Sequence, residues 1–295
     1  MSDNHKAWAP AYSLIFAVGL DGKATAIGNA FVVAAIKNEG IVLTAAHNVR
    51  ALDQLAARGS PFRTLSEARL ANPHFESRLH RVLGGRPNVP GEIPTMNCFS
   101  TPGEKDFDVA MGLITLSNDA DSFPLRFSLK LIPPSVGTQV WAIGWQDFAK
   151  IQEEIAETAT WSWKTTAMTV GGRISAYSLS GSGLTPGAVF EIEGDFGPGL
   201  SGSPVICDVD GLPYVCGVVS SSSNKPNTAV ASAIWPALAL EMTVTPVDGD
   251  PFALSLYKLA QAGAIVIAPG ELERFTVIPG KSAEFVNYDP TLRAP

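Results

Sequence analysis

Residues 24–47 read ATAIGNAFVVAAIKNEGIVLTAAH and contain two apolar runs, 24–34 and 41–44. The segment 37–40, Lys-Asn-Glu-Gly, separates them and has the composition of a turn. Apolar, β-branched runs separated by turns are typical of antiparallel strands. The stretch therefore predicts a β-hairpin, and the small residues after its second strand leave room for the ring of His47.

The same pattern continues along much of the chain. The 27 glycines and 22 prolines favour many tight turns and few long helices. The sequence therefore predicts an all-β protein, a sandwich or a barrel. Further runs of this kind are 13–20, 109–116, 139–143, 165–170, 189–192, 205–207 and 215–220.

Three segments depart from the strand pattern. Residues 48–58 are rich in Ala, Leu and Gln and predict a short helix. The segment 63–104 is poorly periodic and rich in Pro and Gly, so we expect an insertion with little regular structure. Near the end, 251–262 predicts a helix, followed by a strand-like run at 264–268 and an irregular tail.

Composition excludes several classes of protein. The chain has 295 residues, 46% of them hydrophobic and 17% charged, which suits a globular domain and not a disordered chain. A net charge of −7 gives no general electrostatic footprint for nucleic acid. Seven arginines make one region locally basic, and they form either a solvated surface or a face that docks a partner. They are Arg50, Arg58, Arg63, Arg69, Arg78, Arg81 and Arg86.

The expected location follows from the apolar segments and the cysteines. The longest apolar stretch near the N-terminus, 11–20, is too short to span a bilayer and lacks a small-residue cleavage site after it. Three cysteines argue against a disulfide framework. Cys207 and Cys216 are either a bridge across paired strands or, the favoured reading, two buried thiols. We expect a cytoplasmic protein without a membrane anchor.

A glycine-flanked serine is the strongest chemical feature, in the sequence 199–204, Gly-Leu-Ser-Gly-Ser-Pro. Ser201 is a candidate nucleophile, because glycines tolerate the backbone angles that turn N–H groups toward an oxyanion. Such a serine needs a base, for which His47 is the candidate, and a carboxylate that orients the base. Asp108 opens an apolar strand and is the favoured carboxylate, while Asp106 is the competing one.

These motifs, in the order His47, Asp108, Ser201, resemble the trypsin/chymotrypsin-type serine peptidases. Three supporting stretches also resemble that family: 28–32 (GNAFV), 140–145 (VWAIGW) and 172–175 (GRIS). The resemblance covers about residues 13–240 and is closer to bacterial members, HtrA-like or glutamyl-endopeptidase-like. The chain order differs from that of α/β-hydrolases and subtilisins.

The resemblance implies a chymotrypsin-like fold of two perpendicular six-stranded antiparallel β-barrels. Residues 11–125 would form the first barrel, with His47 and Asp108, and 126–242 the second, with Ser201. Residues 243–295 would be a C-terminal extension with a helix and a short mixed part. The backbone N–H groups of Gly199 and Ser201 would form the oxyanion hole.

Departures from the family pattern bear on regulation and specificity. Leu200 stands where many members carry the aspartate that pairs with a new N-terminus, so we expect no activation of that kind. Asp195 lies at the position of the S1 pocket base, where it would select Arg or Lys. The competing reading makes Asp195 a turn residue. Ser220 and Ser222 would contact the substrate backbone.

The expected function is a serine endopeptidase acting on a protein or peptide substrate, with no cofactor and no metal. The alternatives are a catalytically silent binding or scaffold protein of the same fold and an esterase. The extension 243–295 would pack on the barrels, occupy the cleft or recruit a regulatory partner.

Overall fold

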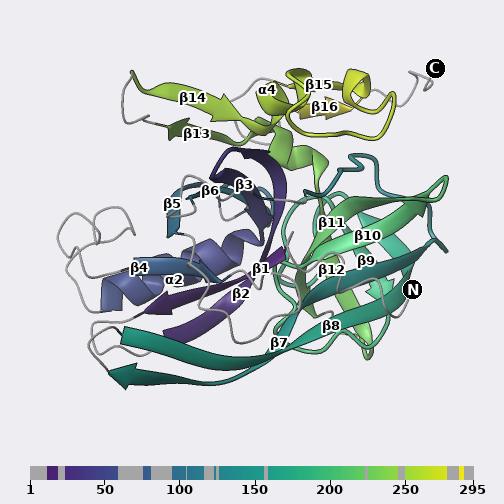
Figure 1. Ribbon diagram of the computed structural model, residues 1–295. Coiled ribbons are helices and arrows are strands. Elements are labelled where there is room, and N and C mark those ends of the chain that lie inside the picture. The colour runs from purple at the N-terminus through teal and green to yellow at the C-terminus, as the bar shows by residue number, and fades with distance from the viewer. Residues whose placement is uncertain are drawn as a thin grey trace.

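The protein is described from a computed structural model (Figure 1), which places residues 12–18, 24–58, 76–80, 95–103, 105–115, 123, 126–155, 159–222, 225–244, 250–277 and 286–288. Strands form two groups side by side, and a smaller layer made by the C-terminal residues lies across them. The prediction of a mostly β protein is confirmed.

The N-terminal group consists of strands that pair antiparallel in the ring β1-β2-β3-β6-β5-β4. Strands β4 and β5 are joined by a single residue pair, Arg78 with Thr95. Because β4 and β5 lie within 63–104, the prediction of little regular structure there is wrong for these two strands. The bounds are β1 Tyr12–Val18, β2 Ala24–Ile36, β3 Glu39–Thr44, β4 Glu76–His80, β5 Thr95–Ser100 and β6 Ala110–Thr115.

The second group is a closed six-stranded antiparallel barrel in the order β10-β11-β12-β9-β8-β7. A barrel of this type was predicted and is confirmed, although β12 was missed because its residues, TAVASA, carry little hydrophobic signal. The bounds are β7 Gln139–Ile155, β8 Ala159–Ser178, β9 Val189–Glu193, β10 Pro204–Val209, β11 Leu212–Ser222 and β12 Thr228–Ala233.

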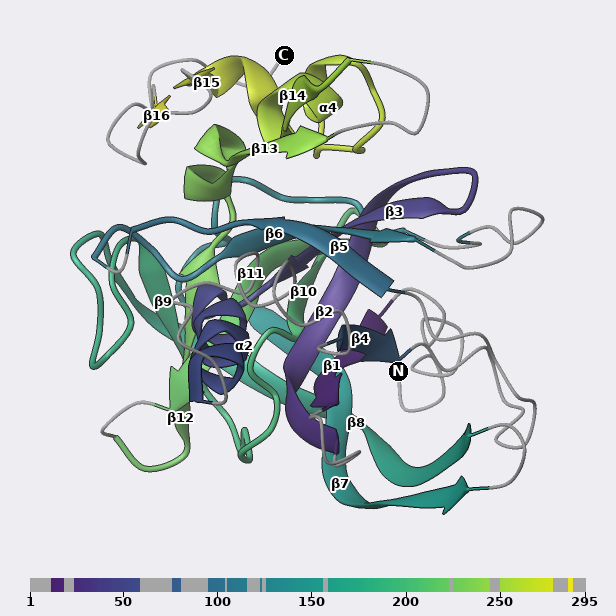
Figure 2. The same ribbon diagram turned by 90° about the vertical axis from the view of Figure 1, so that its left-hand side faces the viewer.

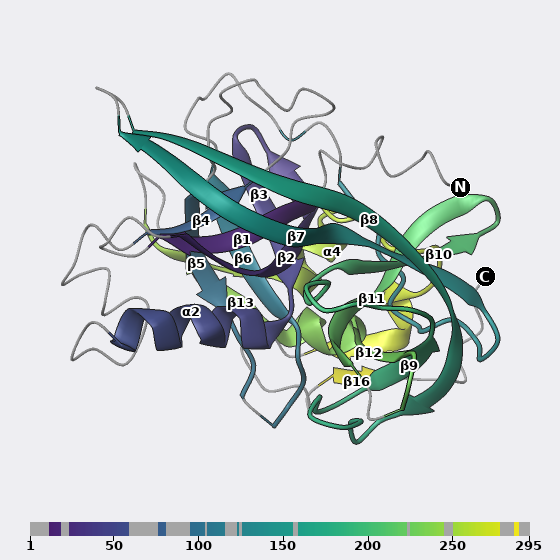
Figure 3. The ribbon, with the colours of Figure 1, turned by 90° about the horizontal axis from the view of Figure 1, so that it is seen from below.

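The β7–β8 hairpin is much longer than the runs 139–143 and 165–170 predicted. Strand β7 pairs with β10 only through Val140, Trp141 and Ala142, while its pairing with β8 continues to Ile155. Seen from below, the hairpin extends beyond its own barrel and passes under β1 and β2 (Figure 3). It thereby links the two groups of strands.

Helix α2 (Ala46–Arg58) follows β3 directly. Ala46, Val49 and Leu52 are buried at helical spacing, so one face of the helix packs against the barrel. The helix begins two residues earlier than the predicted range 48–58. His47 therefore belongs to its first turn and not to the end of a strand.

The C-terminal residues form a layer over both groups of strands, as Figures 1 and 2 show. The helix predicted over 251–262 begins only at Leu256, because Phe252–Ser255 pairs with β13 and the Ser255 hydroxyl accepts from Lys258 N at 3.1 Å as a cap. The strand-like run 264–268 makes a single bridge, Ile267 to Leu129. The elements are η2 Trp235–Ala239, β13 Glu241–Val244, β14 Phe252–Ser255, α4 Leu256–Gln261, η3 Leu272–Arg274, β15 Phe275–Val277 and β16 Val286–Tyr288.

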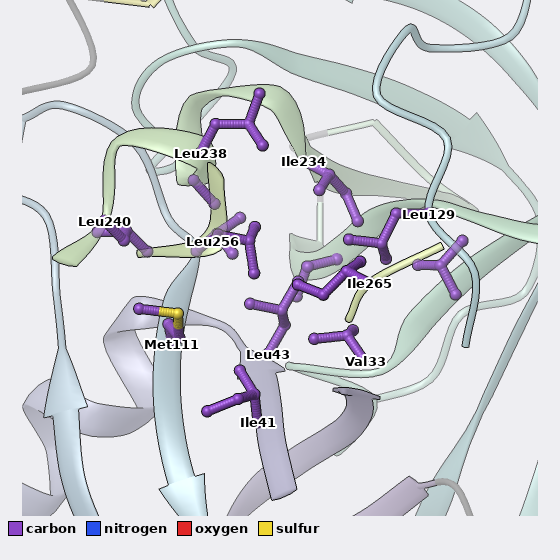
Figure 4. Packing of buried hydrophobic residues seen from close by; sticks show 14 of the residues in the cluster. Val33, Ile41, Leu43, Met111, Leu129, Ile234, Leu238, Leu240, Leu256 and Ile265 are labelled. Carbon is purple, nitrogen blue, oxygen red and sulfur yellow. The ribbon is translucent and has the colours of Figure 1, made fainter. Parts of the chain in front are cut away.

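The largest hydrophobic cluster joins this layer to the strands below it (Figure 4). The cluster contains Leu43 of β3 and Leu129 of the connecting segment, residues 126–138 before β7. From the C-terminal side it contains Leu238, Leu256 and Ile265. All are fully or almost fully buried. Each such side chain contributes about 1.5–3 kcal/mol through removal from water. Of the roles expected for the extension, packing on the barrels is the one the structure shows.

Polar contacts fix the same layer to the connecting segment between the two groups of strands. Leu129 N donates to Val266 O and Ala268 N donates to Leu129 O, both at 2.8 Å. The buried Glu271 carboxylate accepts from Leu131 N at 2.6 Å and also contacts Lys130 Nζ. None of the helices in the described part of the chain is long and apolar enough to cross a membrane.

Candidate active site

His47 and Asp108 form a close pair in the N-terminal half of the site. The His47 ring, through Nδ1, lies 2.7 Å from Asp108 Oδ2, and His47 N donates to Asp108 Oδ1 at 2.8 Å. The Asp108 side chain is 4% exposed and that of His47 39%. One nitrogen of the imidazole is thus held by a buried carboxylate, which fixes the ring and favours a proton on Nδ1.

The competing carboxylate, Asp106, is engaged elsewhere. Its Oδ2 accepts from Gly103 N at 3.1 Å, and Asp106 N donates to Gly103 O at the same distance. These contacts close a turn before Asp108. Asp106 therefore serves the local backbone, while Asp108 faces the histidine.

Arg50 also contacts the Asp108 carboxylate, a role that the sequence did not reveal. Its Nη2 donates to Asp108 Oδ1 at 3.1 Å, and its side chain is 25% exposed. Arg50 lies one helical turn after His47 on α2, a spacing that places both side chains on one face. It was grouped with the arginines of a solvated or docking surface, but the structure directs it to the Asp108 carboxylate.

Ser201 is held in place through its backbone. Its carbonyl accepts from Asn29 N at 2.7 Å and from Asn48 Nδ2 at 3.2 Å, and Asn48 is the residue after His47. Gly202 has a φ of +84°, and a Cβ there would lie 2.0 Å from the Asn29 carbonyl oxygen. The glycine thus permits a close approach that brings Ser201 to the side of the site that carries His47.

The hydroxyl of Ser201 has a different partner from the one a triad would give it. Its Oγ donates to the Ser220 carbonyl at 3.2 Å. In ligand-free sites, catalytic hydrogen bonds are often loose and form only when substrate is bound.

The two N–H groups expected to bind an oxyanion are available. Within the described part of the chain, neither Gly199 N nor Ser201 N donates to a backbone carbonyl. Gly199 is exposed and has a φ of +95°. A loop with unengaged N–H groups beside a serine hydroxyl can stabilise negative charge on a substrate oxygen.

The expected substrate-binding residues are placed unequally. Asp195 is exposed in a tight turn, where Phe196 N donates to Gly194 O at 3.0 Å. The Ser220 side chain is buried and its Oγ lies 2.8 Å from Ser232 Oγ, so it points into the barrel. Ser222 lies in β11 opposite Ala229, and its side chain is outside the described set.

A polar cluster ties the loop after β8 to the segment before β12. Glu191 accepts from Ser182 Oγ at 2.9 Å and from Lys225 Nζ at 2.6 Å. The hydrogen bond from Lys225 lowers the pKa of the Glu191 carboxyl below its usual value. In the same region the Thr185 Oγ1 lies 2.8 Å from Ser221 Oγ, which holds the loop against β11.

The two thiols of the second barrel are free and buried, as the favoured reading of the sequence predicted. Burial raises the pKa of the Cys216 thiol well above its usual range. Burial raises the pKa of Tyr177 to about 12, and the nearby Cys216 is the second largest cause of this shift. The hydrogen bond from Cys216 instead lowers the pKa of the Cys207 thiol, so the two thiols differ in acidity.

Among the residues that the structure places, no group of three or more His, Cys, Asp or Glu side chains is arranged to hold a metal ion.

Comparisons with known proteins find similarity only among solved structures. No protein-family model matches the chain, and the search of curated proteins finds no match. Among solved structures, the active form of the Rv3671c protease from M. tuberculosis matches with 16% identity and a TM-score of 0.45, covering 77% of each chain. The thermostable serine protease AL20 from an extremophilic microorganism matches with 14% identity and a TM-score of 0.46, covering 76% of this chain and 91% of that one.

A viral enzyme, an inactive mutant of the Murine Norovirus NS6 protease, matches with 12% identity and a TM-score of 0.35, covering 70% of this chain and 88% of that one. All three matches carry protease names, and the chain is similar to them at low sequence identity. The roles of individual residues rest on this chain's own contacts.

Proposed function

We propose that this protein is a serine endopeptidase of the trypsin/chymotrypsin type, with His47, Asp108 and Ser201 as its triad. The observation that carries the proposal is the 2.7 Å contact between His47 Nδ1 and a carboxylate oxygen of buried Asp108. A histidine oriented in this way is suited to take a proton from a hydroxyl at its other ring nitrogen. The candidate hydroxyl is that of Ser201, whose carbonyl accepts a hydrogen bond from Asn48, the residue after His47.

In the proposed reaction Ser201 Oγ attacks the carbonyl carbon of a peptide bond while its proton passes to His47 Nε2. Asp108 holds the imidazolium that forms. The N–H groups of Gly199 and Ser201 stabilise the oxyanion, and in serine peptidases removal of one such donor costs about 2.7–4 kcal/mol in the barrier.

Collapse of the tetrahedral intermediate breaks the C–N bond, and His47 gives its proton to the leaving amine. Water then attacks the acyl-enzyme, losing a proton to His47, which returns that proton to Ser201 as the acid product leaves.

The residue before the nucleophile supports activity without an N-terminal cleavage. Leu200 is 1% exposed and belongs to the hydrophobic cluster of the second barrel, with Val140 and Val205. An apolar side chain in this environment has no charge to offer a new N-terminus. We expect the full chain to be active as synthesised.

Covalent labelling tests the proposal. A fluorophosphonate probe should label the wild type, and Ser201→Ala should abolish labelling. Ser203→Ala is the matched control, because the Ser203 hydroxyl is buried two residues away and has no hydrogen-bond partner among the described residues. Labelling that survives Ser201→Ala, or a folded wild type that takes no label, would contradict the proposal. Turnover of peptide and simple ester substrates compared on the same protein separates a peptidase from an esterase.

A binding protein without catalysis is the second candidate. The hydrogen bond from Ser201 Oγ to the Ser220 carbonyl favours it, because the hydroxyl is then engaged by a backbone carbonyl. A protein of this kind would bind a peptide yet take no label at Ser201, so the same experiment distinguishes the two.

Specificity for Arg or Lys before the cleaved bond is the finer part of the proposal and rests on Asp195. Its exposed carboxylate is free to meet a basic side chain. Cleavage after Arg or Lys, measured against cleavage after Glu and Phe, should fall in Asp195→Asn. Equal cleavage of all four in the wild type would leave Asp195 as a turn residue only.

A further inference from the structure

The Asn29 side chain makes contacts that have no role in the proposed triad. It lies in β2 and is fully buried, yet its carboxamide reaches two segments of the second barrel. Nδ2 donates to the Gly199 carbonyl at 2.8 Å, and Oδ1 accepts from Trp145 N at 2.8 Å. One side chain therefore joins the first group of strands, β7 and the loop before Ser201.

The orientation of this carboxamide is fixed by its partners. A backbone carbonyl can only accept and a backbone N–H can only donate, so Nδ2 must face Gly199 and Oδ1 must face Trp145. A flipped amide would set oxygen against oxygen and N–H against N–H. Asparagine thus meets a requirement for one donor and one acceptor that neither an ionised aspartate nor a leucine meets.

The backbone of Asn29 holds the other end of the same loop. Asn29 N donates to the Ser201 carbonyl at 2.7 Å, and the Asn29 carbonyl accepts from Thr44 Oγ1 at 2.6 Å. Asn29 therefore holds the carbonyls of both Gly199 and Ser201. These are the two residues whose N–H groups are the candidate oxyanion donors.

Anchoring these carbonyls limits how the loop can turn. Each peptide unit is planar, so the loop changes conformation only by rotation about φ and ψ. The side-chain bond at Gly199 restrains a residue that otherwise has the widest choice of backbone angles. Without that bond, Gly199 could change its φ and ψ angles and turn its N–H, which lies across its Cα from the anchored carbonyl, away from the oxyanion position.

We propose that Asn29 is a positioning residue that preorganises the oxyanion donors of Gly199 and Ser201. The inference deepens the proposed peptidase function and rests on it. A buried asparagine with a structural role alone would affect stability, whereas a positioning residue also affects the transition state when the protein is fully folded.

The test compares Asn29→Asp and Asn29→Ser with the wild type on a peptide substrate, below the unfolding temperature of each. Asn29→Asp keeps an acceptor for Trp145 N but sets an oxygen against the Gly199 carbonyl. We expect kcat to fall by about 10²-fold with KM nearly unchanged, the size of effect that a small misplacement of catalytic groups produces. Affinity for a peptide aldehyde, whose adduct carries the oxyanion, should fall in parallel.

Ser255→Ala is the matched control for lost stability. Ser255 is also fully buried and bonded to a backbone N–H, but it caps α4 in the C-terminal layer. It should lower the melting temperature and leave kcat unchanged.

A folded Asn29→Asp or Asn29→Ser with the kcat and aldehyde affinity of the wild type would overturn the proposal. The wild type offers a test that needs no variant, since the Asn29 carboxamide and Trp145 amide protons should exchange slowly with solvent. Fast exchange of these protons in the folded protein would also overturn it. A wild type that takes no label at Ser201 would instead refute the peptidase function itself.

Discussion

Asp108 and Ser201 are held in the candidate site by different parts of their residues. The Asp108 carboxylate accepts three hydrogen bonds, from His47 N, His47 Nδ1 and Arg50 Nη2. Ser201 is held by its backbone carbonyl, while its hydroxyl has one partner, the Ser220 carbonyl. In the proposed triad, the base is thus oriented without substrate, whereas the side chain of the nucleophile is held by a single hydrogen bond to a carbonyl.

The largest effect is expected on the side of the base. Asp108→Asn replaces a carboxylate that accepts three hydrogen bonds with an amide, and the His47 tautomer then loses its support. In a serine peptidase such a change lowers kcat by about 10⁴-fold, measured with a peptide substrate. Asp106→Asn is the control, because it changes only the turn at Gly103. A loss of equal size in Asp106→Asn would mean that the wrong carboxylate has been assigned.

On the serine side, a backbone change should act on stability. In Gly202→Ala the new Cβ would meet the Asn29 carbonyl oxygen at 2.0 Å in a residue with φ +84°. We expect the free energy of unfolding to fall by about 3–5 kcal/mol in denaturant titrations. Gly211→Ala has a similar φ of +82° but open space around it, so it should cost only about 1–2 kcal/mol. Equal losses would show that the close contact carries no weight.

Removal of the third contact to Asp108 should have a moderate effect. Arg50→Met deletes the ion pair and should lower the free energy of unfolding by about 1–3 kcal/mol, as for hydrogen bonds to charged groups. The gain from Arg50 is limited, because its Nη1 is buried without a hydrogen-bond partner in the part of the chain that the structure places. Arg173→Met, which removes an exposed contact to the Gly137 carbonyl, is the control. If Arg50→Met were as stable as the wild type, the ion pair would contribute nothing to the Asp108 side.

The smallest effect is expected at the ion pair between Glu191 and Lys225, which is far more exposed than the Asp108 contacts. The Lys225 side chain is 65% exposed, so the pair is worth less than about 1 kcal/mol. The pKa of Glu191 is lowered in the folded state, so its contribution is present above the unfolded pKa and is lost as pH falls through the folded pKa.

Lys225→Met should therefore be less stable than the wild type at neutral pH and equally stable in acid. Thermal unfolding measured from pH 7 down to below the folded pKa of Glu191 checks this. A difference in stability that grows toward low pH has the wrong sign for this pair.

The sequence predicted those parts of the site that depend on residue type and local pattern. His47, Asp108 and Ser201 stand out because each follows or opens an apolar run or lies between glycines, and the structure brings the first two into contact. Arg50 and Asn29 were missed as site residues. Their contacts join segments far apart in the chain, for example Asn29 with Gly199, and no local pattern reports such a contact.

The fold divides in the same way. Strands with strong apolar runs, such as β3 and β6, were predicted, while β4 and β5 were not, because partners distant in sequence stabilise them. The first part of the predicted helix at 251–262 is a strand, since pairing with β13 overrides the local helix preference of 252–255. Local sequence pattern was therefore enough to predict β3 and β6, whereas β4, β5 and β14 depend on contacts with distant segments.

The bridges of Leu129 have a consequence for the order of folding during synthesis. Leu129 pairs in parallel both with Val215 and with Ile267, so the connecting segment has its full set of neighbours only once the chain has been made past residue 268. Contacts of such high sequence separation form late and slowly. Nascent chains that end before this point carry His47, Asp108 and Ser201 but lack the C-terminal residues of the largest hydrophobic cluster. Under the proposed function, such chains would carry the candidate triad in a fold whose largest hydrophobic cluster is still incomplete.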